Sequence, residues 1–127
     1  MRRVVVTGLG LLSSIGNDAY STWSNLTSGK SGIKKISNFD TEGLTCKIAG
    51  YISHEEKDEF YIDRLDFLEP REINRNDRFI QYGLIAASMA VKDSGIDLLS
   101  EQSKYRIGVT VGSGIGGLET IYNGSLT

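Results

Sequence analysis

The stretch RIGVTVGSGIGGLET, residues 106–120, decides the fold class. Its first part, RIGVTV, is rich in β-branched residues and does not alternate with polar ones, which is typical of a strand buried in a parallel sheet. The glycines of GSGIGG predict a tight turn, and a helix is expected to open near Gly117. A second run of this kind, RVVVT at 3–7, is bounded by Gly8 and predicts another buried strand. Together these segments predict an α/β fold.

The strongest helical pattern lies between these two runs, over Asn76–Ser94. Apolar residues recur at i, i+4, i+7 and i+11 and also occupy other faces, so the helix is expected to be buried nearly all round. Gly95 follows at the position where glycine commonly ends a helix. Several small residues along the helix would let another backbone pack closely: Gly83, Ala86, Ala87, Ser88 and Ala90.

Shorter elements are predicted in the first half of the chain. Asn17 is the expected N-cap of an amphipathic helix, and Gly29 is expected to follow its end. Residues 32–36 predict a short extended piece. The alternating segment 46–52 predicts a second, more exposed strand.

The segment 54–75 is rich in charged residues and predicts a surface excursion with short helical turns, one of them beginning at Pro70. His54, the only histidine of the chain, opens this segment beside two glutamates. A histidine in such surroundings is usually solvated. A metal site would need three or four converging ligands, so no metal site is expected around it.

Composition narrows the class of protein. The chain has 127 residues with 14 Lys and Arg against 16 Asp and Glu, a net charge of −2, which argues against a nucleic-acid-binding protein. The length suits one domain, and no apolar run approaches the roughly 20 residues that cross a bilayer. Its single cysteine, Cys46, excludes an internal disulfide and a thiolate metal cage. We therefore expect a cytoplasmic protein without a membrane segment.

The glycines invite a nucleotide-binding interpretation. Gly112, Gly114 and Gly117 match the dinucleotide fingerprint G-x-G-x-x-G after a predicted strand. The fingerprint also needs an acidic residue about 20 positions later, and only ten residues follow Gly117. After Gly8 the comparable stretch holds no acid. A nucleotide-binding α/β protein therefore stays open as a weaker alternative.

Cys46 could be considered as a nucleophile. A nucleophilic cysteine needs a neighbouring base or a helix N-terminus that lowers its pKa. Cys46 lies instead in the alternating segment 46–52, and no histidine belongs to a motif with it. No catalytic residue is therefore predicted within the chain.

Several ordered motifs together resemble the opening of the β-ketoacyl-acyl-carrier-protein synthases, in particular the elongating synthase II subgroup. The resemblance covers essentially the whole chain. One small departure is Arg75-Asn76-Asp77, where the family tends to have a basic-basic-Met-Asp stretch. The motifs are RRVVVTGLGLLSSIGN at 2–17, W-x-x-L-x-x-G-x-SGI at 23–33, FDT at 39–41, KIAG at 47–50, NDRFIQYGLIAASMAVKDSGI at 76–96 and RIGVTVGSGIGGLET at 106–120.

The resemblance implies a thiolase-like layered α/β fold, of which residues 1–127 would be only the first part of the N-terminal half, one incomplete domain. The chain would supply two core strands and the long helix of the middle layer. The family is several times longer. Its acyl-accepting cysteine and two histidines would lie beyond Thr127, so this chain by itself is expected to be inactive.

The resemblance also assigns one residue to substrate binding. GSGIGG falls where the family lines its acyl tunnel, and Ile115 matches the apolar residue that touches the acyl chain. Acyl-carrier protein and malonyl-carrier protein are the implied partners of a homodimeric enzyme that needs no cofactor. A non-catalytic scaffold, or a decayed synthase-like subunit, stays open as an alternative.

Overall fold

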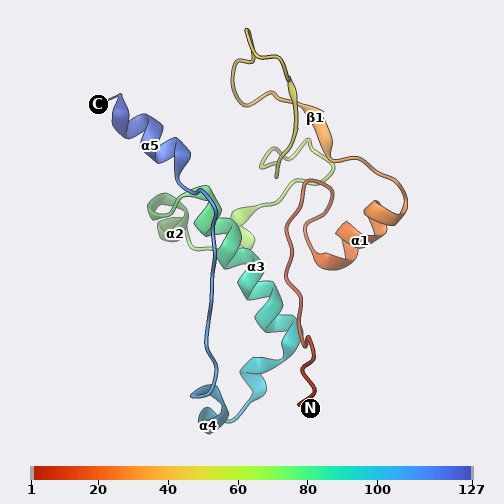
Figure 1. Ribbon diagram of the computed structural model, residues 1–127, viewed down its shortest axis with the longest axis vertical. Coiled ribbons are helices and arrows are strands. Elements are labelled where there is room, and N and C mark those ends of the chain that lie inside the picture. The colour runs from red at the N-terminus through yellow and green to blue at the C-terminus, as the bar shows by residue number, and fades with distance from the viewer. Residues whose placement is uncertain (1, 127) are drawn as a thin grey trace. The chain divides into compact units, whose positions relative to one another are not determined.

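A computed structural model describes residues 2–126 as two units (Figure 1). Of the described residues, the first unit contains 2–10 and 64–126, and the second contains Leu11–Asp63. Within residues 2–126, no helix is both long and apolar enough to cross a membrane.

Helices dominate the first unit. The 3-10 turn η1 (Arg64–Asp66) precedes the short helix α2 (Pro70–Arg75) and the long helix α3 (Arg78–Ser94). The 3-10 turn η2 (Ile96–Leu98), α4 (Glu101–Lys104) and α5 (Leu118–Ser125) complete the unit.

Several helix ends confirm the sequence-based predictions. Pro70 stands at the first position of α2, where its missing N–H costs nothing. Gly95 ends α3 with a left-handed backbone, φ 64°, and α5 begins directly after Gly117. The predicted start of α3 at Asn76 is two residues early, because Asp77 takes the extended backbone of an N-cap, with φ −62° and ψ 157°.

The predicted strands at 3–7 and 106–111 are not formed. Neither segment is paired as a strand, and their valines are exposed, Val4 at 91% and Val109 at 86%. A buried parallel strand takes its hydrogen bonds from neighbouring strands. Within residues 2–126 the one sheet is a pair of short strands in the other unit, so neither segment has a partner.

The prediction that α3 is buried nearly all round is also wrong for this chain. Among its residues only Gln81 and Ile85 are buried, and Leu84 is 40% exposed. The apolar faces of α3 lack covering elements within the described residues. The expected close packing on its small residues is confirmed at two places, since a Cβ on Gly10 would lie 1.8 Å from the carbonyl oxygen of Ala86 and one on Gly8 would lie 2.4 Å from that of Ala90.

The path of the chain brings both ends of α3 into contact with later elements of the same unit. η2 follows directly after α3, and the segment after α4 returns to the N-terminal end, where Gly116 meets Phe79 (Figure 1). This return places the turn before α5 beside the first turn of α3.

The second unit contains helix α1 (Ala19–Thr27) and the strands β1 (Ile33–Lys35) and β2 (Ile48–Gly50). The strands pair antiparallel with Lys34 opposite Ala49, which confirms the extended piece and the exposed strand predicted here. Gly29 follows α1 with a left-handed backbone, φ 77°, as expected.

The N-cap of α1 is Asp18, one residue after the predicted Asn17. The Asp18 carboxylate accepts a 2.7 Å hydrogen bond from the Ser21 N–H in a capping box. The Asn17 amide instead donates to the carbonyl oxygen of Tyr61, 44 residues further along the chain. The Asn17 side chain, which the sequence predicts as the N-cap, is therefore used in a tertiary hydrogen bond.

The predicted surface excursion at 54–75 spans both units and does contain short helical turns, η1 and α2. Two of its apolar residues are nevertheless buried, Ile62 at 4% exposure and Leu68 at 7%. The excursion is therefore anchored by apolar side chains between charged, exposed ones.

Candidate functional site

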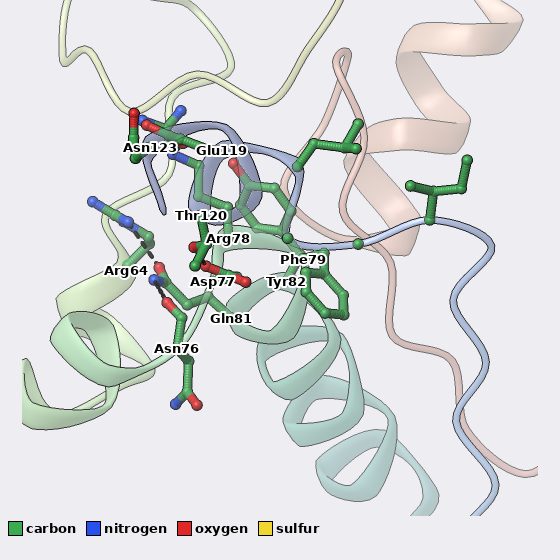
Figure 2. Close-up of a pocket in the computed structure, with 14 residues that line it drawn as sticks. Arg64, Asn76, Asp77, Arg78, Phe79, Gln81, Tyr82, Glu119, Thr120 and Asn123 are labelled. Carbon is green, nitrogen blue, oxygen red and sulfur yellow. Dashed lines mark hydrogen bonds and ion pairs between the residues drawn. The ribbon is translucent and has the colours of Figure 1, made fainter. Parts of the chain in front are cut away.

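A depression of about 530 Å³ lies in the first unit, between the N-terminal ends of α3 and α5 (Figure 2). Ile115, the one site residue that the sequence predicts, is in its lining. The lining residues come from η1, the start of α3 and the turn into α5: Arg64, Asn76, Asp77, Arg78, Phe79, Gln81, Tyr82, Ile115, Gly116, Gly117, Leu118, Glu119, Thr120 and Asn123.

Two glycines let the turn before α5 approach α3 closely. A Cβ on Gly116 would lie 2.6 Å from the ring of Phe79, and one on Gly117 would lie 2.6 Å from Oδ2 of Asp77. Gly117 also has φ 69°, a left-handed backbone that a side chain disfavours. Gly116 and Gly117 therefore serve contact with α3.

Asp77 links the two helices. It occupies the N-cap position of α3, but its side chain makes no capping hydrogen bond there. Instead the hydroxyl of Thr120, in the first turn of α5, donates a hydrogen bond to Oδ1 of Asp77 (Figure 2). A carboxylate acceptor makes this a charge-assisted bond, which is stronger than one between neutral groups.

An ion pair lies beside this hydrogen bond. Nε of Arg78 is 3.5 Å from Oε2 of Glu119, and both side chains are more than half exposed. Exposed pairs of this kind contribute about 0–1 kcal/mol, because water screens them. The pair therefore adds little stability to the contact between α3 and α5.

Gln81 is the buried polar centre of the floor, with 3% exposure. Its Oε1 accepts a 2.7 Å hydrogen bond from Nη1 of Arg64. Its Nε2 donates to the carbonyl oxygen of Asn76 at 2.7 Å (Figure 2). It also donates to the carbonyl oxygen of Ile73 at 2.9 Å. These bonds tie α3 to η1 and to the end of α2, and they satisfy an amide that would be costly to bury unpaired.

Tyr82 of α3 also lines the depression. Burial raises the pKa of its phenol above the usual 10.0, and the positive charges of Arg78 and Arg64 oppose that shift in part. Raising the pKa extends the pH range over which the phenol is neutral.

Ile115 is 78% exposed and directly precedes the two glycines that contact α3. The sequence singled out this residue but missed Asp77, Phe79 and Thr120. Asp77 is recognisable in the sequence only as a residue type suited to an N-cap, a local role. No sequence pattern indicated that its partner would be 43 residues away.

Cys46 and His54 lie in the second unit, outside this depression. The thiol of Cys46 is exposed and donates to the carbonyl oxygen of Ile48 at 3.3 Å. Nδ1 of His54 lies 3.2 Å from the carbonyl oxygen of Ile62. Each is therefore engaged with nearby backbone. Among residues 2–126 no group of three or more His, Cys, Asp and Glu side chains could hold a metal ion.

The dinucleotide fingerprint lacks its structural context. It requires a strand that leads into the glycine turn, and the residues before Gly112 form no strand. Gly112 and Gly114 have open space where a Cβ would stand, whereas Gly117 contacts Asp77. The geometry therefore gives no support to the nucleotide-binding alternative.

Comparisons with known proteins identify the family. The family model described as "Beta-ketoacyl synthase, N-terminal domain" matches residues 1–126. The chain is 47% identical over 119 residues to the 3-oxoacyl-[acyl-carrier-protein] synthase 2 of Staphylococcus aureus (strain COL), covering 94% of this chain and 27% of that protein. It is 42% identical over 123 residues to the enzyme of the same name from Vibrio cholerae, covering 97% and 28%.

A solved structure agrees with these relatives. The ishigamide ketosynthase/chain length factor superposes with a TM-score of 0.62 at 34% identity, covering 80% of this chain and 23% of that one. This likeness confirms the predicted class, a partial thiolase-like α/β fold. The chain spans about a quarter of the length of the curated relatives it matches. It belongs to the β-ketoacyl synthase family, and residues 1–126 match the model of that family's N-terminal domain.

Proposed function

We propose that this chain is the N-terminal part of a 3-oxoacyl-acyl-carrier-protein synthase that elongates fatty acids. The observation that carries the proposal is the match of residues 1–126 to the family's N-terminal domain, together with the two similar synthases. As one incomplete domain, the chain would supply scaffold and part of the substrate tunnel.

The proposed reaction is a decarboxylative Claisen condensation. An acyl group passes from its carrier protein to a cysteine thiolate, and the carrier thiol leaves. Malonyl-carrier protein then loses CO2, and the resulting carbanion attacks the acyl thioester carbonyl. The cysteine thiolate departs and 3-oxoacyl-carrier protein is released. Two histidines and an oxyanion hole would stabilise the developing negative charge.

None of these catalytic groups is proposed within this chain. It has one cysteine and one histidine, so a set of one cysteine and two histidines cannot be assembled from it. Cys46 and His54 are each engaged with local backbone, which supports this assignment. We expect the chain by itself to be inactive, with the reactive cysteine and histidines supplied from beyond Thr127.

Ile115 is proposed to line the acyl tunnel. Glycines flank it on both sides, so it is the only bulky side chain in GSGIGG. It is largely exposed and borders a depression that also contains Phe79, Tyr82 and Leu118. These side chains would offer apolar contacts to an acyl chain within a lining that also holds polar and charged residues. The partners proposed for the complete enzyme are acyl-carrier and malonyl-carrier protein, in a cytoplasmic homodimer without a cofactor, nucleic acid or membrane.

The test begins with the coding sequence after Thr127, which should encode a cysteine and two histidines in the same reading frame. The complete protein is then incubated with labelled acyl-carrier protein and malonyl-carrier protein, beside the 127-residue chain alone. Labelled 3-oxoacyl product should form only with the complete protein. A coding sequence that ends at Thr127 would overturn the proposal and leave a non-catalytic subunit, and product from the chain alone would refute its inactivity.

A further inference from the structure

We propose that Asp77 and Thr120 are positioning residues for chain-length selection, because they hold the turn that carries Ile115. This inference rests on the proposed function, in which Ile115 limits the acyl tunnel. We call the contact of Asp77 and Phe79 with Gly116, Gly117 and Thr120 the α3–α5 clasp.

The first observation is the unusual use of the Asp77 carboxylate. A residue of this type at an N-cap normally accepts from the N–H groups of its own first turn. Asp77 makes no such bond, and its Oδ1 accepts from the hydroxyl of Thr120 instead. The side chain is therefore bonded to the first turn of α5 and does not cap α3.

The second observation is how closely the turn is seated. Gly116 and Gly117 approach Phe79 and Asp77 so closely that a Cβ on either glycine would lie only 2.6 Å from a neighbouring atom. The left-handed backbone of Gly117 then turns the chain into α5. The clasp thus fixes the backbone directly after Ile115, at Gly116 and Gly117.

The third observation is that little of this chain packs against Ile115. With 78% of its surface exposed in this chain, its position here depends on the backbone rather than on packing of its own side chain against residues 2–126. The next residue is Gly116, which is in the clasp. Loosening the clasp would therefore let Ile115 yield to a long acyl chain.

The test uses three single variants of the complete protein. Thr120→Val keeps the shape of the side chain and removes the hydroxyl that bonds Asp77, whereas Thr120→Ser keeps that hydroxyl. Ser125→Ala is the matched control, because the Ser125 hydroxyl in the same helix donates only locally, to the carbonyl oxygen of Tyr122.

Amide hydrogen exchange measures how firmly the clasp is closed, and it does so independently of activity. The first helical bond of α5 joins the Ile121 N–H to the carbonyl oxygen of Gly117 at 2.9 Å. Exchange in peptides covering 115–122 should be faster in Thr120→Val and unchanged in Thr120→Ser and Ser125→Ala, since local opening sets exchange rates. Unchanged exchange in Thr120→Val would overturn the clasp.

Steady-state kinetics measure the effect of the clasp on the preference for long or short acyl substrates. In the complete synthase, Ile115→Phe should lower kcat/KM for a long acyl substrate relative to a short one. Combined with Thr120→Val, that selective loss should shrink by at least about twofold, the lower end of couplings within one hydrogen-bond network. When Ile115→Phe is combined with Thr120→Ser instead, the full selective loss of kcat/KM for the long substrate should remain, because the hydroxyl that bonds Asp77 is kept. A merely structural role would lower kcat/KM for both substrates equally and leave the ratio unchanged, which would overturn the inference.

The two failures are distinguishable. If the complete protein makes no 3-oxoacyl product, or Ile115→Phe has no length-selective effect, the proposed function or its tunnel residue fails, and the positioning role fails with it. If Ile115→Phe is length-selective but Thr120→Val neither speeds exchange nor changes that selectivity, the positioning role alone fails.

Discussion

The backbone N–H of Leu9 donates a 2.8 Å hydrogen bond to the carboxylate of Asp93, 84 residues later in the chain. The glycines on either side lie against the same helix, because a Cβ on Gly8 would be 2.4 Å from the carbonyl oxygen of Ala90 and one on Gly10 would be 1.8 Å from that of Ala86. Gly8 and Gly10 thus serve close approach to α3 and not the binding of a phosphate.

Replacing Gly10 with Ala should destabilise the complete protein by about 3 kcal/mol, near the top of the usual range for overpacking. The added methyl group would meet backbone atoms of α3, which cannot rotate away. The measurement is the free energy of unfolding in urea. Gly114→Ala is the matched control, since that position has open space. Equal stability of the two variants would contradict the close approach.

The 127-residue chain alone should associate in solution. The valines of 3–7 and 106–111 are largely exposed and unpaired in a sheet, and α3 buries few of its side chains. Exposed apolar patches and unpaired extended segments favour association. Light scattering after size exclusion, with a thermal melt of the same sample, checks this. A strictly monomeric sample with a sharp cooperative melt would disprove it.

Ile115→Phe in the complete synthase should lower kcat/KM for a long acyl-carrier substrate roughly 5- to 150-fold relative to a short one. A short acyl chain ends before the enlarged side chain, whereas a long one must displace packed atoms at about 1–3 kcal/mol. The ratio of kcat/KM for the two substrates is the measurement. An equal fall for both lengths would show that Ile115 supports the fold instead.

Asp58 should make the stability of the second unit sensitive to acid. Hydrogen bonds from Lys34, at 2.8 Å, and from Ser53 hold the pKa of its carboxyl below the usual 3.8. A lowered pKa stabilises the folded state above the unfolded pKa, and this stabilisation is lost as the pH falls from about 4 through the lower folded pKa.

The check is urea unfolding of the wild type and of Asp58→Asn between pH 6 and pH 2. The wild type should be more stable at pH 6, and its advantage should vanish at the acid end. Lys34→Met, which removes the largest cause of the shift, should weaken the pH dependence while leaving Asp58 in place. An advantage of the wild type that stays constant with pH would refute the assignment.

Local elements followed from the sequence because their causes are local. Pro70 starts α2, Gly95 and Gly117 supply left-handed backbone beside α3 and α5, and alternation at 46–52 marks β2. These residues act on the backbone within a few positions of themselves. The order of the motifs likewise identified the family, and Ile115 stood out as the bulky residue among glycines.

What only the tertiary structure decided was the identity of distant partners. Whether 3–7 and 106–111 become strands depends on neighbouring strands, because a strand takes its hydrogen bonds from other segments. The side chains of Asn17 and Asp77 suit caps equally well in sequence, yet they bond Tyr61 and Thr120 instead. A polar side chain satisfies itself with whichever donor or acceptor the fold brings near, and that choice lies outside the reach of local pattern.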